Sequence, residues 1–178
     1  MALEQENWES RDMRYIWHPA AQMKDYEALP PMVIARAKGV WLYDVHGKKY
    51  LDIISSWWCN LFGHCNPIIN QAVKEQIDNL EHVIFANFSN EAAIRLAEAL
   101  AKIVPKGLAK FHFNDNGSAA VEAALKMCFQ YHLQTGHPER QKFMCLSEGY
   151  HGETIGALSV GSLDLYAQMY KPMMMENV

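Results

Sequence analysis

A glycine–serine turn in the middle of the chain is the strongest candidate for chemistry. Residues 109–113 are predicted to form a strand, residues 114–118 a polar turn and residues 119–134 a helix. The first N–H groups of a helix lack internal acceptors and carry partial positive charge, so this end is suited to binding a phosphate. Gly117 would let the backbone approach such a group closely, and Ser118 is able either to cap the helix or to hydrogen-bond a phosphate oxygen. An ordinary N-cap turn has the same residue types, so both interpretations stay open at this point.

A tyrosine and a histidine lie between two glycines at 149–152, directly after a second predicted strand at 142–146. Ligands of an open parallel sheet bind beyond the carboxyl ends of its strands. Tyr150 is therefore placed to stack on a planar cofactor, and the flanking glycines would allow a close approach. A turn with a partly buried tyrosine is the alternative that the residues leave open.

Two adjacent tryptophans, Trp57 and Trp58, follow two serines at the end of a predicted β-hairpin. Neighbouring side chains of an extended strand point to opposite faces, so both indole rings cannot enter one core. One ring is therefore expected to line a pocket or an interface. Ordinary core packing of the tryptophans is the alternative.

The N-terminal half of the chain supplies a hairpin and two helices. Residues 39–52 alternate between apolar and polar types, which predicts a β-hairpin with its turn at 44–47, whereas residues 1–32 are expected to be irregular. A helix is predicted to begin at Asn66–Pro67, and another to run from Ser89 or Asn90 to about Ile103.

The order of strand, helix and strand between residues 109 and 146 favours a parallel α/β sheet, because the connection is long enough for a crossover. Only two or three such strands are recognisable, whereas a typical sheet has about five or six. We therefore expect the chain to be part of a larger fold.

Composition excludes several classes of protein. Half of the 178 residues are hydrophobic and a fifth are charged, which does not fit a disordered chain, and 16 basic against 20 acidic residues do not fit nucleic-acid binding by bulk charge. No apolar run is long enough to span a membrane, and the first residues have no secretory pattern. The cysteines lack CxxC spacing, so we expect reduced thiols, no metal site and a cytoplasmic location.

Four motifs occur in one order: Trp-His-Pro at 17–19, Ser-Ser-Trp-Trp at 55–58, Asp-Asn-Gly-Ser and an alanine-rich helix at 115–127, and Gly-Tyr-His-Gly-Glu-Thr at 149–154. This order resembles the N-terminal portion of the class III, pyridoxal-phosphate-dependent aminotransferases, from about Tyr15 to Pro172. The resemblance implies an incomplete α/β fold of the fold-type-I transferases. Residues 1–54 would form an N-terminal segment with the hairpin, and residues 55–178 the first part of the major cofactor-binding domain.

The resemblance also implies roles for single residues. Gly117 and Ser118 would hold the phosphate of pyridoxal 5'-phosphate, Tyr150 would stack on its ring, and His151 would support that wall. Trp57 and Tyr150 would line the substrate pocket. Ala20 stands where other members carry an aromatic residue after the same proline, which leaves space in that pocket. Residues 82–87 would lie at the interface of a homodimer.

The lysine that forms the Schiff base, and the aspartate that pairs with the pyridinium nitrogen, are expected beyond Val178. No catalytic residue is therefore assigned within the chain, and the chain alone is expected to be inactive. The complete enzyme would carry an amino group from a small-molecule donor, S-adenosylmethionine or lysine, to the keto acceptor 8-amino-7-oxononanoate in biotin biosynthesis. An ω-amino-acid or diamine aminotransferase with another acceptor, and a non-catalytic fragment that binds a partner, are the alternatives.

Overall fold

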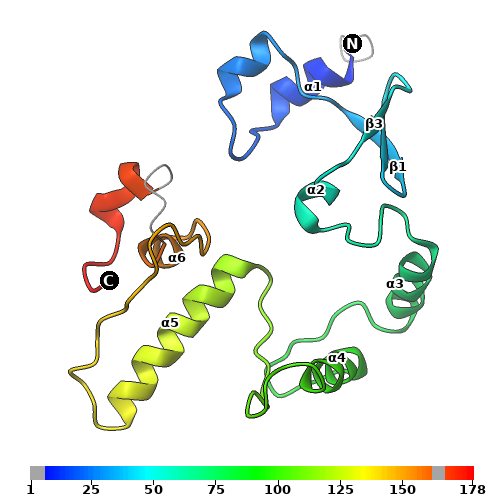
Figure 1. Ribbon diagram of the computed structural model, residues 1–178. Helices are drawn as coiled ribbons and strands as arrows, with labels where there is room; N and C mark the ends of the chain where they lie inside the picture. The colour runs from blue at the N-terminus through cyan, green and yellow to red at the C-terminus, as the bar shows by residue number, and fades with distance from the viewer. Residues whose placement is uncertain (1–6, 162–166) are drawn as a thin grey trace. The chain divides into compact units, whose positions relative to one another are not determined.

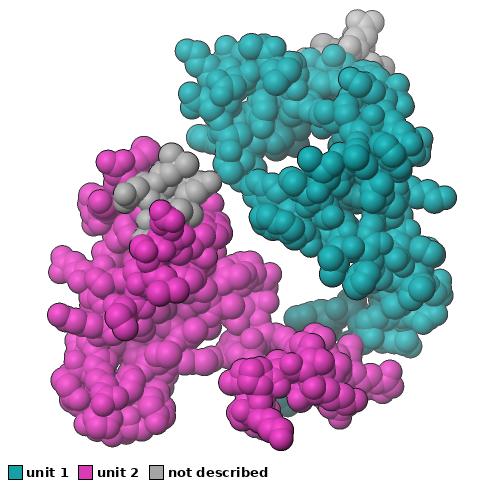
Figure 2. Space-filling view, in the orientation of Figure 1, with its two compact units in different colours: residues 1–88 teal, residues 89–178 magenta. Residues whose placement is uncertain are grey.

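The structure is a computed structural model that describes residues 7–161 and 167–178. The chain forms two compact units that divide between Phe88 and Ser89, drawn in two colours in Figure 2. The boundary predicted between residues 54 and 55 divides the domains of the complete fold, and it stays a prediction. None of the helices in the described ranges combines the length and apolar composition of a membrane span.

A three-stranded antiparallel sheet is the centre of the first unit (Figure 1). The strands β1 (Ile34–Lys38), β2 (Trp41–Asp44) and β3 (Lys49–Leu51) follow one another in sequence and in the sheet. The predicted hairpin is confirmed by β2 and β3. The strand β1 was not predicted, because its register on β2 shifts between Ile34 and Arg36 and interrupts the alternation that identifies a strand.

The hairpin turn is organised by one buried carboxylate, that of Asp44. It accepts hydrogen bonds from the backbone N–H groups of His46 (2.9 Å) and Lys48 (2.8 Å) and from the Tyr50 hydroxyl (2.8 Å). Burial raises the pKa of Asp44, but these hydrogen bonds outweigh burial and leave the pKa below its ordinary value of 3.8. The turn at 44–47 was predicted, whereas the carboxylate network that stabilises it was not.

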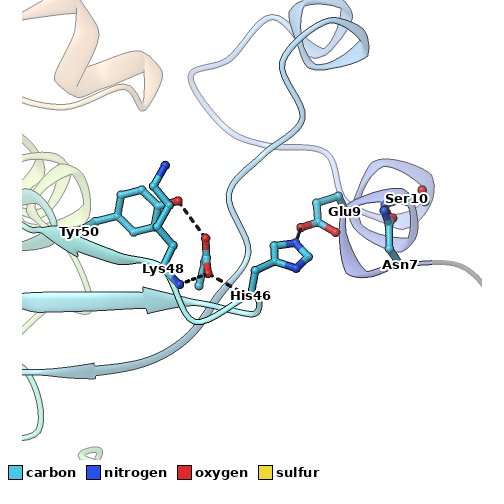
Figure 3. Close-up of polar contacts among 7 residues, drawn as sticks. Asn7, Glu9, Ser10, His46, Lys48 and Tyr50 are labelled. Atoms are coloured by element: carbon cyan, nitrogen blue, oxygen red, sulfur yellow. Dashed lines mark hydrogen bonds and ion pairs between the residues drawn. The ribbon is translucent and has the colours of Figure 1, made fainter.

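A short helix, α1 (Trp8–Tyr15), corrects the expectation that residues 1–32 are irregular. The side chain of Asn7 accepts a hydrogen bond from Ser10 N at 2.9 Å and so caps the helix. Glu9 then contacts His46 in the hairpin turn, with 2.8 Å between Oε1 and Nε2 (Figure 3). The helix has no buried residue. A 3-10 helix, η1 (Met23–Glu27), follows it.

Both helices predicted between the hairpin and the glycine–serine turn are confirmed. The helix α3 (Pro67–Asn79) begins after Asn66, whose side chain accepts from the N–H groups of Ile68 and Ile69, and Pro67 occupies the first turn. The helix α4 (Glu91–Ala101) begins after Asn90, whose side chain accepts from Ala93 N. Between the hairpin and α3 lies α2 (Ser55–Trp58), a turn described below.

The second unit is built on the long helix α5 (Gly117–Gln134), which packs against the short helix α6 (Ile155–Ser159). The buried apolar residues of the unit gather at α6 and the chain near it: Ala157, Leu158, Val160 and Ala167. Ser159, also buried, accepts a hydrogen bond from Met175 N at 2.9 Å. This bond ties the segment after η2 (Gln168–Met173) to α6.

The two strands predicted at 109–113 and 142–146 do not form strands in the described part of the chain, where the one sheet is antiparallel. A parallel strand requires at least one neighbouring strand that accepts and donates its backbone hydrogen bonds. In the second segment, Phe143 N donates to Asn177 O at 2.8 Å, and Asn177 does not belong to a strand. Its apolar side chains stay exposed, with Met144 at 98% and Leu146 at 81%.

Replacing Asn66 by alanine tests the cap of α3. Asn66→Ala is expected to lower the free energy of unfolding by about 1 kcal/mol, because two N–H groups of the first helical turn lose their acceptor. Asn70→Ala is the matched control, since Asn70 is exposed on the same helix and alanine favours helix. Urea unfolding of both variants measures the difference, and an equal midpoint for the two would contradict the role of Asn66.

Candidate functional site

The first turn of α5 leaves Ser118 free for a role other than capping. Asn116 is the N-cap, and its side chain accepts from Ala119 N at 2.8 Å. The first backbone bond of the helix runs from Ala120 N to Asn116 O, so the N–H groups of Gly117 and Ser118 precede the intrahelical ladder. Gly117 faces open space, because a Cβ built on it has no atom within 4 Å. The alternative that Ser118 is the N-cap is therefore wrong.

The loop at 149–154 packs directly on this turn. Ser118 Oγ accepts a hydrogen bond from Glu153 N at 3.3 Å. Gly152, buried and with a φ of +122°, lies so close that an added Cβ would be 2.0 Å from Ser118 Oγ. Only glycine fits both this backbone conformation and this approach. The structure thus brings the glycine–serine turn and the Gly-Tyr-His-Gly loop together, although they are more than thirty residues apart in sequence.

A second contact fixes the same loop to α5 through Glu122. Its Oε1 accepts from Gly156 N at 2.8 Å and from Ala157 N at 3.3 Å, the first N–H groups of α6. The pKa of Glu122 lies below its ordinary value of 4.5, chiefly because the Thr154 side chain donates a hydrogen bond to it, whereas burial acts in the opposite direction. Sequence analysis missed this role, because nothing in the local spacing relates Glu122 to residues 154–157.

Tyr150 and His151 project from the loop that these contacts hold. The Tyr150 side chain is 55% exposed, and its hydroxyl donates to Glu153 Oε1 at 3.3 Å. The His151 ring lies beside Gly149, where an added Cβ would be 3.2 Å from Nε2. An exposed aromatic ring therefore stands on the loop that packs against the start of α5, as the stacking interpretation requires. The stacking interpretation and the alternative of a partly buried tyrosine both stay predictions.

Trp57 and Trp58 lie in the first unit, on a turn whose backbone is left-handed. Ser55, Ser56, Trp57 and Trp58 have φ values of 49°, 48°, 57° and 67°. The expectation that the tryptophans continue an extended strand is wrong. Both side chains are nonetheless exposed, at 66% for Trp57 and 80% for Trp58, so neither is packed in the core of this unit.

Asp52 is the residue that organises the tryptophan turn. It accepts hydrogen bonds from Ser56 N (3.0 Å), Ser56 Oγ (2.8 Å) and His64 Nε2 (2.8 Å). The bond from Ser56 N, followed by those from His64 and the Ser56 hydroxyl, lowers the pKa of Asp52 from 3.8 to about 2. Sequence analysis assigned no role to Asp52 or His64.

Ala20 lies in an exposed turn after Pro19, with a φ of 51°. The preceding histidine is anchored, with 2.6 Å between His18 Nε2 and Asp12 Oδ2. Ala20 and Trp57 thus belong to the first unit, whereas Gly117, Ser118, Tyr150 and His151 belong to the second. Within residues 7–161 and 167–178, no three histidine, cysteine, aspartate or glutamate side chains gather in a way that could hold a metal ion.

Comparison with known proteins decides the family. Residues 22–178, most of the chain, match the aminotransferase class-III family. The chain belongs to the class III aminotransferases. The resemblance seen in the four sequence motifs is therefore confirmed.

This aminotransferase chain is similar to curated proteins of one name. It is 44% identical over 167 residues to the adenosylmethionine-8-amino-7-oxononanoate aminotransferase of Geobacter sulfurreducens, covering 94% of this chain and 37% of that protein. It is 45% identical over 175 residues to the Helicobacter pylori protein of the same name, covering 98% of this chain and 40% of that protein. The chain thus spans about two fifths of the length of these relatives.

Solved structures confirm the predicted fold class, the first part of an α/β fold-type-I transferase. The adenosylmethionine-8-amino-7-oxononanoate aminotransferase of Methanocaldococcus jannaschii matches with a TM-score of 0.90 at 44% identity, over 94% of this chain and 38% of that chain. The omega transaminase of Pseudomonas jessenii in complex with PMP matches with a TM-score of 0.90 at 26% identity, over 97% and 38%.

Substitution of Gly152 tests the approach of the loop to α5. Gly152→Ala is expected to lower the free energy of unfolding by about 1–3 kcal/mol more than Gly107→Ala, because its Cβ would overlap Ser118. Gly107 is the matched control, since it also has a positive φ but open space around its Cβ. Chemical denaturation compares the two, and equal losses would mean that backbone conformation alone requires glycine at 152.

The lowered pKa of Glu122 predicts an acid-sensitive contact between α5 and α6. A carboxyl with a lowered folded-state pKa stabilises the fold above its unfolded pKa, and this stabilisation disappears as the pH falls through the folded pKa. Urea midpoints at about pH 5.5 and about pH 3 are therefore expected to differ less in Glu122→Gln than in the unsubstituted chain. Glu98→Gln on α4, with an exposed carboxylate, should keep the full pH dependence. An unchanged dependence in Glu122→Gln would contradict the assignment.

Proposed function

We propose that the protein carrying this chain is a pyridoxal-phosphate-dependent aminotransferase of biotin biosynthesis. It converts 8-amino-7-oxononanoate to 7,8-diaminononanoate, with S-adenosylmethionine or lysine as the amino donor. The observation that carries this proposal is the identity of 40–45% with relatives of that one name, which extends over nearly the whole chain. The packing of the loop at 149–154 on the start of α5 also supports it, because it brings together the residues to which the resemblance gives cofactor-binding roles.

The start of α5 fits the phosphate of pyridoxal 5'-phosphate. The N–H groups of Gly117 and Ser118 are outside the intrahelical ladder, and the helix dipole adds partial positive charge at this end of an 18-residue helix. Open space at Gly117 leaves room for a phosphate oxygen close to the backbone. Ser118 Oγ accepts from Glu153 N, so its own hydrogen remains able to donate to that oxygen.

Tyr150 and His151 are assigned to the ring of the same cofactor. The exposed Tyr150 ring belongs to the loop that Gly152 and Glu122 hold against α5, which keeps it on the segment that packs beside the phosphate cradle. An aromatic face placed in this way stacks on a pyridine ring, with His151 behind it. When bound, the cofactor supplies an electron sink for the bonds at the substrate's amino carbon.

Trp57, Tyr150 and Ala20 are assigned to the substrate. The exposed indole of Trp57 offers apolar surface to an aliphatic chain, and the small side chain of Ala20 leaves room where other members of the class carry an aromatic ring. The lysine and the aspartate that the chemistry requires are expected in chain beyond Val178. We therefore expect amino transfer from the longer protein, as a cytoplasmic homodimer acting on small molecules without nucleic acid or membrane.

An ω-amino-acid or diamine aminotransferase is the second candidate, favoured by Ala20 and by the similarity to the omega transaminase of Pseudomonas jessenii. The test compares two reactions of the full-length protein. In the first, 8-amino-7-oxononanoate is the acceptor, and S-adenosylmethionine or lysine is the amino donor. In the second, pyruvate is the acceptor and 1,4-diaminobutane is the donor. The biotin-pathway assignment expects the first acceptor to be strongly preferred. Preference for pyruvate would establish the second candidate, and activity with neither acceptor would contradict both.

The phosphate cradle is tested by Ser118→Ala. Loss of a hydrogen bond to a charged phosphate is expected to weaken pyridoxal phosphate binding by about tenfold or more. Ser89→Ala is the control, because Ser89 precedes α4 and lies outside the assigned site. Absorbance titration of the 178-residue chain, followed by borohydride and intact mass, measures affinity and covalent attachment. Equal affinity in the two variants would remove Ser118 from the site, and a stoichiometric adduct would place the Schiff-base lysine within this chain.

A further inference from the structure

The tryptophan turn is the most strained backbone in the described residues. Four successive residues without glycine, from Ser55 to Trp58, have positive φ values. Residues with a Cβ avoid this conformation, and runs of it occur only where the surroundings hold them in place. Strain of this kind collects at functional sites, so the contacts that maintain it identify residues with a positioning role.

Backbone hydrogen bonds account for only part of the turn. Trp58 N donates to Ile54 O at 2.9 Å, and Asn60 N donates to Ser55 O at 3.1 Å. Ser56, inside the turn, is held by two hydrogen bonds to the Asp52 carboxylate, one donated by its N–H and one by its hydroxyl. The third hydrogen bond to that carboxylate comes from His64.

Asp52 and His64 are themselves fixed by the sheet. Asp52 N donates to Val40 O at 2.9 Å, at the end of the hairpin. His64 and Gly39 exchange two backbone hydrogen bonds of 2.9 Å and 2.8 Å. The two side chains are mostly buried, with 6% of Asp52 and 13% of His64 exposed. The carboxylate is therefore a rigid acceptor at the point where the hairpin meets the turn.

The three side chains do not form a nucleophilic triad. Ser56 Oγ donates to the carboxylate of Asp52, whereas a nucleophilic serine would donate to a histidine. Ser56 and His64 each donate a hydrogen bond to the Asp52 carboxylate, so His64 does not accept the proton of the Ser56 hydroxyl. These hydrogen bonds fix the conformation of the turn and do not activate a nucleophile.

We propose that Asp52 is a positioning residue for the substrate. Its carboxylate holds the Ser55–Trp58 turn in the left-handed conformation, and the turn presents the indole of Trp57 to the aliphatic chain of an amino or keto substrate. The proposal rests on the function proposed above for Trp57. Without the carboxylate, the strained turn relaxes and Trp57 loses its fixed orientation, while the hairpin itself remains.

Asp52→Ala is compared with Asp44→Ala, because Asp44 also accepts three hydrogen bonds at the end of a strand but does not contact the tryptophan turn. Hydrogen exchange followed by mass spectrometry is the first measurement, and it needs neither cofactor nor activity. Exchange in residues 53–62 is expected to become about tenfold faster in Asp52→Ala and to stay unchanged in Asp44→Ala. Unchanged exchange in Asp52→Ala, or equal acceleration in both variants, would overturn the proposal. Should Asp52→Ala fail to fold, Asp52→Asn, which keeps one acceptor for Ser56 N, is expected to show a smaller acceleration.

The second measurement is substrate preference in the full-length protein. Asp52→Ala is expected to lower kcat/KM for a six-carbon or eight-carbon amine by about tenfold, in parallel with Trp57→Ala, and to leave that for alanine within about twofold. An equal loss for short and long donors would show a general structural role and overturn the proposal. If the unsubstituted full-length protein transfers no amino group to 8-amino-7-oxononanoate from S-adenosylmethionine or lysine, the proposed function fails, whereas the exchange measurement still decides whether Asp52 holds the turn.

Discussion

The contact between Ser118 and Gly152 is the constraint on which the second unit depends. It places the loop at 149–154 against the first turn of α5 at a distance that only glycine allows. Glu122 reinforces this contact one turn further along the helix. Its carboxylate accepts hydrogen bonds from two N–H groups in the first turn of α6, and these bonds help to lower the pKa of Glu122. The buried residues of α6 then pack on the same side. A helix end and an aromatic loop become one surface because these contacts leave little freedom between them.

Buried carboxylates have a comparable role in the first unit. Asp44 closes the hairpin turn, and Asp52 holds the turn that follows the hairpin, each by accepting three hydrogen bonds. A carboxylate offers several acceptor positions, so it satisfies backbone N–H groups that tight turns leave without partners in a regular ladder. The lowered pKa of Asp52, about 2, keeps these acceptors charged across the physiological range. The unit therefore obtains its geometry from turns as much as from its small sheet.

Membership of the class III aminotransferases gives these local features a common purpose. The helix end with its aromatic loop and the tryptophan turn are the features to which we assign cofactor and substrate roles, and each is held by contacts inside its own unit. The chain spans about two fifths of the length of its relatives. The apolar side chains of Met144 and Leu146, in a segment whose sequence predicts a strand, are exposed.

The sequence by itself determined the elements that depend on local interactions. Asn66 and Asn90 mark helix starts, the alternation at 39–52 marks the hairpin, and the order of four motifs identifies the family. Only the tertiary structure decided that the loop at 149–154 packs on Ser118, that Glu122 holds the start of α6, and that His64 shares the carboxylate of Asp52 beside the left-handed tryptophan turn. Caps and periodicity are encoded within a few residues, whereas a hydrogen bond from one side chain to a distant loop has no local signature. Strands are an intermediate case, because their residue types are local but their stability requires partners that the sequence pattern does not specify.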